Sequence, residues 1–189
     1  MHTKLAEIAQ LINDYRTLLL KSVNPLSQSQ LDWRANEDEW SIGEVLDHLF
    51  LVETRSSKVI SKYATELKDK NISAPPLDGS ALASLDQFQI ETVLTKRKAP
   101  EFLVPRTGIA KAELLAQLEE CRVRLLEIIG ALDAYDLHQF HFPHPVLGKI
   151  DLYQWIIFIG KHERRHLTQV ETILARTEFP ATEATVARL

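Results

Sequence analysis

Apolar residues recur at spacings of three and four along four long segments of this 189-residue chain, and sustained alternation of apolar and polar residues is nearly absent. Such spacing places apolar side chains on one face of an α-helix, whereas a half-buried strand needs a period of two. The predicted helices run from about Lys4 to Lys21, from Ile42 to about Leu67, from about Lys111 to Ala134 and from Asp151 to about Arg176. The sequence therefore predicts an all-α fold, a four-helix bundle.

Short polar motifs mark two of the helix starts. Ser41 is followed three residues later by Glu44, and Asp151 is followed three residues later by Gln154. Each pair can form a capping box, in which each side chain bonds the main-chain amide of the other residue. Pro25 stops the first predicted helix.

The connections between the predicted helices differ in length. Residues 71–109 contain four prolines and leave room for a short helix around 82–94. A link of this length predicts a long crossover between the second and third helices, in a bundle that is not simply up-down-up-down. Residues 138–149 contain Pro143, Pro145 and Gly148 and are predicted to be a loop.

Composition narrows the classes of function. The chain is 45% hydrophobic and 25% charged, so we expect residues 1–189 to form a single domain. A net charge of −4 gives no basic surface for nucleic acid or an anionic membrane, and no stretch resembles a signal peptide or a membrane span. We expect a cytoplasmic protein, in which the single cysteine, Cys121, is a packed or surface thiol.

Three histidines carry the chemistry. His162 and His166 are four residues apart on an apolar stripe of the last helix, so both imidazoles stand on one helix face. His48 occupies the apolar stripe of the second helix and turns toward the same core. Single inward histidines are usually hydrogen-bonded core residues, but three of them without a metal would leave ring nitrogens short of partners. The pattern predicts a site for a divalent metal ion held by His48, His162 and His166.

Two other histidine patterns indicate different sites. His162-Glu163-Arg164-Arg165-His166 matches the H-E-x-x-H helix of zinc proteases, but the glycine and third histidine of the extended motif are absent, as is any strand to hold a peptide. His138, His141 and His144 recur at a spacing of three, but the intervening prolines break any helix that would align them. The first three histidines remain the predicted site.

The chain resembles the DinB-like superfamily of metal-binding four-helix bundles. Residues 40–49, which end in His48-Leu49, resemble the second-helix motif that supplies the family's first metal ligand. Residues 144–150, Trp155 and residues 162–170 resemble the closing helix that supplies the other two ligands. The resemblance extends from the first helix to about Leu174 and implies that all three ligand positions are filled.

The resemblance also implies a range of activities, because some members of the family are thiol-dependent S-transferases or isomerases. Three imidazoles suit Zn, Ni or Fe and leave coordination positions for a thiol or water. We therefore expect a metal-dependent enzyme that transfers a low-molecular-weight thiol, or water, to a small electrophilic substrate. Its candidate catalytic residues are Glu44, Glu163 and Gln169. The alternative is a metal-binding, stress-linked interaction protein without turnover, and the family further suggests a homodimer.

Overall fold

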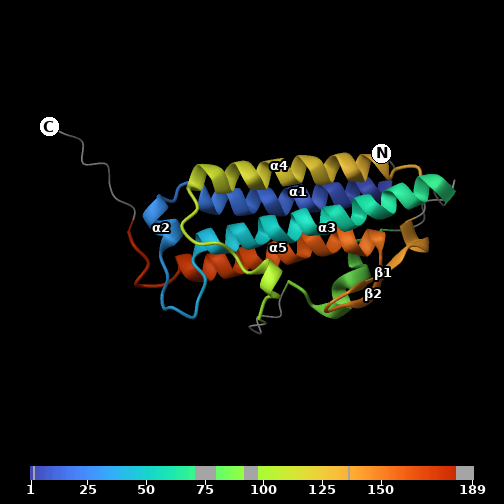
Figure 1. Cartoon of the computed structure of the whole chain (residues 1–189). Helices are drawn as coiled ribbons and strands as arrows, with labels where there is room; N and C mark the ends of the chain where they lie inside the picture. Colours follow the sequence, from blue (N-terminus) through green and yellow to red (C-terminus); the bar gives the residue numbers. More distant parts are fainter. Residues whose placement is uncertain (2, 71–79, 92–97, 136, 182–189) are drawn as a thin grey trace.

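Four long helices lie side by side in the computed structural model of the chain (Figure 1). They are α1 (Thr3–Val23), α3 (Ile42–Lys70), α4 (Lys111–Ala131) and α5 (Leu152–Leu174). Helices α1 and α3 each pack against both α4 and α5, which closes the ring of a bundle. The structure describes residues 1, 3–70, 80–91, 98–135 and 137–181. The predicted all-α bundle is confirmed.

The bundle contains the predicted long crossover. Helices α3 and α4 both begin at the end of the bundle where α2 lies, and α1 and α5 run the other way (Figure 1). The chain must therefore return along the bundle between α3 and α4. Within this connection the short 3-10 helix η1 (Leu82–Phe88) packs against α5, and η2 (Glu101–Leu103) packs against α3. The helix expected around 82–94 is thus a shorter 3-10 helix, and its last three residues lie outside the described part of the chain.

Two segments of the chain differ from the sequence-based expectation. A short helix, α2 (Gln28–Asp32), follows α1; it is too short to show periodicity and begins with its own capping box. The loop predicted over 138–149 was wrong, since this segment holds the 3-10 helix η3 (Leu137–Gln139) and an antiparallel hairpin of β1 (His141–His144) and β2 (Gly148–Asp151). Each strand has only four residues, so neither shows an alternating pattern, and Gly148 takes the positive φ of 75° at the turn.

Both predicted capping boxes form. The Ser41 hydroxyl accepts from the Glu44 amide, and the Glu44 carboxylate accepts from the Ser41 amide at 2.8 Å. Asp151 and Gln154 exchange the corresponding bonds at the start of α5. These caps satisfy main-chain amides at the two helices that carry the three histidines.

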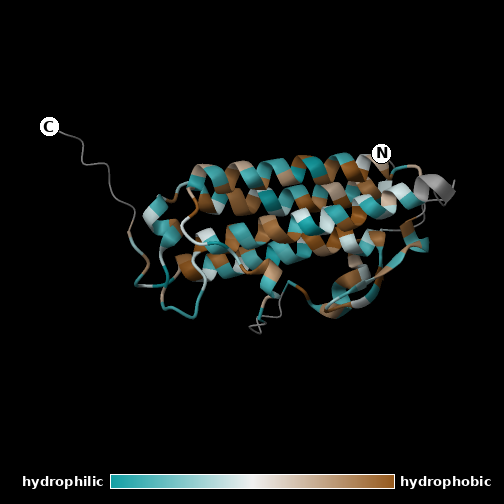
Figure 2. Cartoon of the chain, viewed as in Figure 1, coloured by the Kyte–Doolittle hydropathy of each residue, from teal (hydrophilic) through white to brown (hydrophobic). Residues whose placement is uncertain are grey.

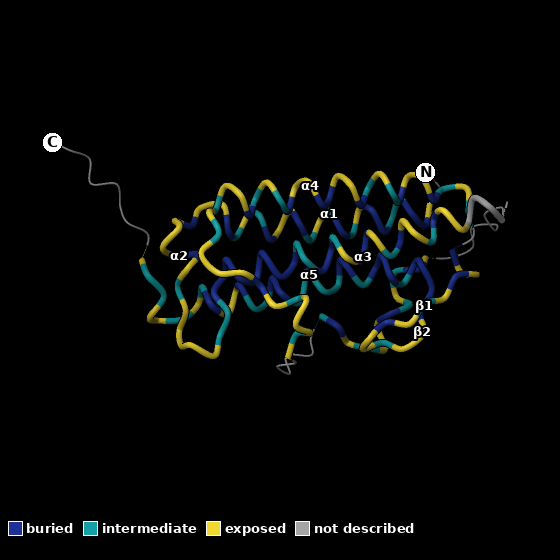
Figure 3. Tube along the Cα trace, viewed as in Figure 1, coloured by how far each residue is buried: buried dark blue, intermediate teal, exposed yellow. Residues whose placement is uncertain are grey.

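The core of the bundle is divided in two by charge. Each long helix carries both apolar and polar residues (Figure 2), and the outward turns of α4 are exposed (Figure 3). One charged residue from each long helix lies buried between two apolar clusters, and together they are called the charged layer: Arg16, Glu53, Arg122 and Glu163. On α1, for example, Ile12 belongs to one cluster and Leu19 to the other, with Arg16 between them. No helix in the described part of the chain is long and apolar enough to cross a membrane.

Candidate metal centre

The bundle brings the three predicted histidines together. His48 comes from the second turn of α3, and His162 and His166 come from neighbouring turns of α5. One ring nitrogen from each lies within 4.8 Å of the other two, and the ring centroids are 4.5 to 5.3 Å apart. His48 and His166 are buried, while His162 is partly exposed. Among the described residues, this is the only group of three or more such side chains with ligand spacing.

A main-chain carbonyl orients His48. Its Nδ1 lies 2.8 Å from the carbonyl oxygen of Leu103 in η2. A carbonyl oxygen only accepts, so Nδ1 carries the proton and Nε2 keeps its lone pair for an ion. The neighbouring Asp47, fully buried, accepts from the main chain and guanidinium of Arg106, each at 2.7 Å. This ion pair anchors the crossover beside His48.

A side-chain amide orients His166 in the same way. Its Nδ1 lies 2.8 Å from Oε1 of Gln169, one turn further along α5. The proton on Nδ1 again leaves Nε2 free to coordinate. Hydrogen bonds of this kind set the tautomer and ring direction of metal-binding histidines. Gln169, a candidate catalytic residue from sequence, therefore acts on the site through His166 in this structure.

The surroundings hold the three imidazoles neutral, as metal ligands must be. Burial lowers the pKa of His48 below its ordinary value of 6.5, although the bond to Leu103 opposes the shift. Burial, followed by repulsion from His48, lowers the pKa of His166 to about 3. Burial and the other two histidines lower the pKa of His162 well below 6.5. The donor set is three neutral nitrogens, which fits Zn, Ni or Fe.

A pocket of about 420 Å³ opens beside the cluster. His166 and Gln169 form part of its wall, and the ring of Trp40, which lies 4.9 Å from that of His48, forms another part. Charged residues of both signs line the pocket as well, among them Lys98, Arg165, Asp38 and Glu39. A small molecule in this pocket would lie next to His166.

Comparison with known proteins agrees with this arrangement. A sequence profile of the DinB superfamily matches residues 12–170. The chain belongs to the DinB superfamily. Members of the DinB superfamily are often metal-binding, and this member holds a candidate three-histidine site. It is 31% identical over 169 residues to the uncharacterized protein YuaE of Bacillus subtilis (strain 168), covering 89% of this chain and 98% of YuaE. No solved structure matches the chain.

Two glutamates proposed as catalytic candidates are engaged elsewhere in this DinB-superfamily bundle. The Glu44 carboxylate caps α3 through the Ser41 amide and pairs with Arg34 at 2.6 Å. Glu163, only 1% exposed, points into the charged layer and pairs with Arg16 and Arg122. A general base needs a carboxylate free to take a proton, so the position of Glu163 does not suit the protease role that the H-E-x-x-H pattern indicates.

The other histidine pattern does not converge. His138 pairs with Asp151 at 2.8 Å, and His141 is exposed on β1. His144 is buried, and its Nδ1 accepts from the main-chain amides of the hairpin turn. Its ring contacts Phe158, which in turn contacts His162. His144 thus packs over one end of the DinB-superfamily site, and burial lowers its pKa to about 4.

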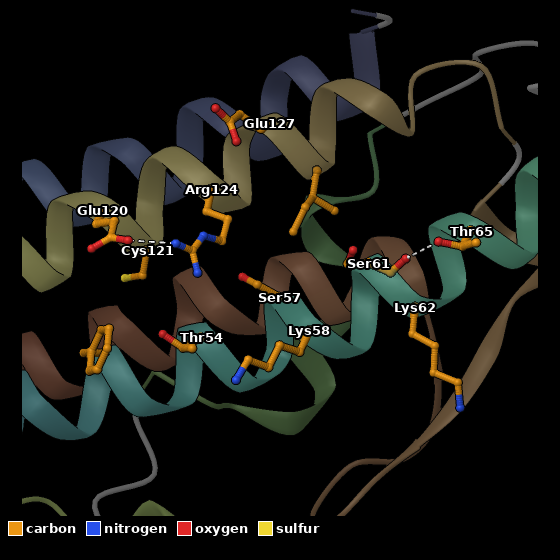
Figure 4. Close-up of a pocket in the computed structure, with 12 residues that line it drawn as sticks. Thr54, Ser57, Lys58, Ser61, Lys62, Thr65, Glu120, Cys121, Arg124 and Glu127 are labelled. Atoms are coloured by element: carbon orange, nitrogen blue, oxygen red, sulfur yellow. Dashed lines mark hydrogen bonds and ion pairs between the residues drawn. The ribbon is translucent and has the colours of Figure 1, made fainter.

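Cys121 lies apart from the histidines, on the wall of a groove between α3 and α4. This groove has a volume of about 440 Å³ and also contains Ser57 and Arg124 (Figure 4). Burial, followed by the nearby Glu53 carboxylate, raises the pKa of the Cys121 thiol to about 12. A thiol with this pKa is almost fully protonated at neutral pH and is a poor nucleophile. Cys121 is buried, so it is the packed one of the two alternatives that the sequence leaves open, packed or surface.

Sequence reasoning missed the two arginines of the charged layer and Glu53. A signal was present, since each of these residues occupies the apolar stripe of its helix. Arg16 lies between Ile12 and Leu19, and Arg122 lies between Leu118 and Leu125. A charge at such a position is costly unless an opposite charge faces it. Opposite charges on the stripes of all four helices would have predicted the layer.

Proposed function

We propose that this DinB-superfamily protein is a metal-dependent enzyme in which His48, His162 and His166 hold a divalent ion, and that it transfers a low-molecular-weight thiol to a small electrophile. The proposal rests on three neutral imidazoles, two of them oriented by hydrogen bonds, that lie together beside a pocket of about 420 Å³ at His166. A structural ion needs no such opening, whereas a reacting ion needs one position free for its substrate.

The ion would act as a Lewis acid that lowers the pKa of a coordinated thiol or water toward neutrality. The protein's own residues supply the geometry. Leu103 and Gln169 direct Nε2 of His48 and His166 toward a common point, which keeps the donors ready without rearrangement. The pocket holds the second substrate beside that point.

The first experiment measures metal content and turnover together. Protein purified without chelator is analysed for Zn, Ni and Fe beside His48→Ala, His162→Ala and the control His141→Ala, whose side chain is exposed and outside the cluster. We expect about one equivalent in the parent and the control, and none in the other two variants. Thiol transfer is then followed with glutathione or cysteine and 1-chloro-2,4-dinitrobenzene, with the free metal as the blank.

The results separate the proposal from its alternatives. Metal binding without thiol-dependent turnover above the blank would favour the non-catalytic role, in which the ion stabilises an interaction protein. Turnover of an ester or amide without thiol would identify water as the nucleophile. A parent protein that takes up no metal even after reconstitution would refute the enzyme and the metal site alike.

A homodimer is part of the same proposal and rests on the family resemblance. Sedimentation equilibrium of the parent protein gives the mass directly, and a single species at 21.6 kDa would refute it.

A further inference from the structure

We propose that the charged layer is a positioning device, which sets α5 against α3 so that the three histidines converge before an ion arrives. The inference rests on the proposed metal site and assigns it a second set of residues: Arg16, Glu53, Arg122 and Glu163. None of them touches the site's donor atoms as a ligand, so each is a positioning residue rather than a catalytic one.

The layer joins all four helices in one closed set of ion pairs. Arg16 on α1 donates to Glu53 on α3 at 2.7 Å and also to Glu163 on α5. Arg122 on α4 donates to Glu53 at 2.9 and 3.0 Å and to Glu163 at 2.7 Å. Each carboxylate therefore bonds both guanidinium groups. All four side chains are at most 5% exposed, and the two positive charges match the two negative ones.

Main-chain carbonyls complete the arrangement. The remaining guanidinium nitrogens reach the carbonyl oxygens of neighbouring helices: Arg16 donates to Leu118 on α4, and Arg122 donates to Ile12 on α1. Because these bonds end on main chain, they fix the positions of α1 and α4 relative to each other along the bundle axis. Apolar contacts above and below the layer lack this directionality.

The charged layer lies close to the three histidines along α3 and α5. Glu163 lies between His162 and His166 on α5, and Glu53 is five residues beyond His48 on α3, which is about 7.5 Å along the helix axis. Arg16 and Arg122 each bridge these two glutamates, so they link the two histidine-bearing helices at this level. A slide of α5 along α3 would break these bonds and separate the imidazoles at the same time.

Stability alone does not account for such a layer. Desolvation of four charges offsets much of their attraction, and apolar side chains of similar volume often replace buried ion pairs without loss of stability. The best-attested use of buried charge is to select one packing register among several. Metal ligands need such selection, because donor atoms must be held to about 0.5 Å.

The test compares layer variants with a matched core variant. Glu163→Gln keeps the shape of the side chain and removes its charge. The double variant Glu53→Met with Arg122→Met removes one charge of each sign, leaves the Arg16–Glu163 pair and provides a second folded protein. The control is Ile129→Ala or Ile129→Val, a buried residue on α4 seven positions beyond Arg122, whichever matches the loss of melting temperature.

Two measurements are made on each folded protein well below its melting temperature. Zinc affinity, from competition with a chromogenic chelator, is expected to fall by about 10-fold to 100-fold in both layer variants and to stay within twofold of the parent in the control. In metal-free protein, long-range proton–nitrogen NMR is expected to show protonated Nδ1 in His48 and His166 of the parent and the control, and mixed tautomers in the layer variants.

The outcomes separate this inference from the proposed function. Layer variants that keep parental zinc affinity and fixed tautomers would overturn the positioning role even if the parent is an active metalloenzyme. A parent that binds none of Zn, Ni and Fe would refute the proposed function, and the tautomers of the metal-free proteins would still decide the positioning role. Equal losses in layer variants and in the stability-matched control would also overturn it.

Discussion

At the scale of single residues, the hydrogen-bond acceptor of Nδ1 sets the tautomer of His48 and of His166. His48 donates to the Leu103 carbonyl and His166 donates to Gln169, so both keep the lone pair of Nε2 for an ion. Both acceptors lie outside the apolar stripes from which the histidines were predicted. The sequence indicates Gln169 as a candidate catalytic residue, and in the structure it is the hydrogen-bond acceptor of His166.

The bond from His166 to Gln169 can be removed on its own. Gln169→Leu leaves the Nδ1 proton of His166 without its acceptor, and we expect zinc affinity to fall by about 10-fold to 100-fold. Gln169→Glu retains an acceptor and should bind at least as tightly as the parent. Chelator competition measures both. Parental affinity in Gln169→Leu would show that the hydrogen bond does not orient the ring.

At the scale of elements, the contact between α1 and α5 depends on a glycine. A Cβ on Gly160 of α5 would lie 2.9 Å from Cγ2 of Ile12, a branched side chain with little room to move. The absence of a side chain lets the two helices approach closely within two residues of His162. Caps at Ser41 and Asp151 then hold the starts of α3 and α5.

Two glycine substitutions are expected to change the free energy of unfolding in opposite directions. Gly160→Ala forces Ile12 to move and is expected to cost about 1 to 3 kcal/mol of unfolding free energy. Gly130→Ala, on an exposed position of α4 with no atom near the added Cβ, is expected to stabilise by about 0.5 to 1 kcal/mol. Urea unfolding of both variants measures the difference. A loss of stability in Gly130→Ala equal to that in Gly160→Ala would refute the close approach.

At the scale of the whole molecule, burial of ionisable groups couples folding to pH and to metal. The bundle keeps several imidazoles neutral inside and encloses two arginines with two glutamates in its core. Both arrangements exist only in the folded chain, so protons and metal ions each shift the unfolding equilibrium.

Stability should fall as the pH drops below 6.5. Burial lowers the folded-state pKa of His144 to about 4 and of His166 to about 3, and that of His162 lies well below 6.5. Between these values and 6.5 the unfolded chain binds protons that the folded protein excludes, so acid favours unfolding. His144 and His166 should each remove on the order of 1 kcal/mol between pH 6 and pH 5 in metal-free protein.

Urea unfolding across this range tests the pH dependence. His144→Gln should make the dependence on pH less steep. A stability that is constant between pH 6.5 and pH 5 would contradict buried, neutral imidazoles.

Metal should raise the melting temperature through the same site. Zinc at 100 times its dissociation constant contributes about 2.7 kcal/mol, which corresponds to roughly 5 to 10 °C for a chain of this size. Excess chelator should reverse the shift, and His48→Ala should abolish it while His141→Ala keeps it. Differential scanning calorimetry checks these values, and an equal shift in His48→Ala would place the ion elsewhere.

The sequence by itself determined the class of fold, the four long helices, two of the caps and the stripe on which each histidine lies. These are local properties, because an apolar period of 3.6 and a capping box are written within a few turns of one helix. It failed for α2 and the β1–β2 hairpin, whose elements are too short to repeat a pattern.

Only the tertiary structure decided which groups from different helices meet. It brought His48 to within ligand spacing of the α5 pair, set the Leu103 carbonyl against it and closed the charged layer around Glu163. The physical reason is that these contacts join residues from 37 to 147 positions apart, and their geometry is set by helix packing rather than by local spacing. Glu163 occupies the position of the general base in the H-E-x-x-H pattern of zinc proteases. Its neighbours in space, Arg16 and Arg122, give it a different role.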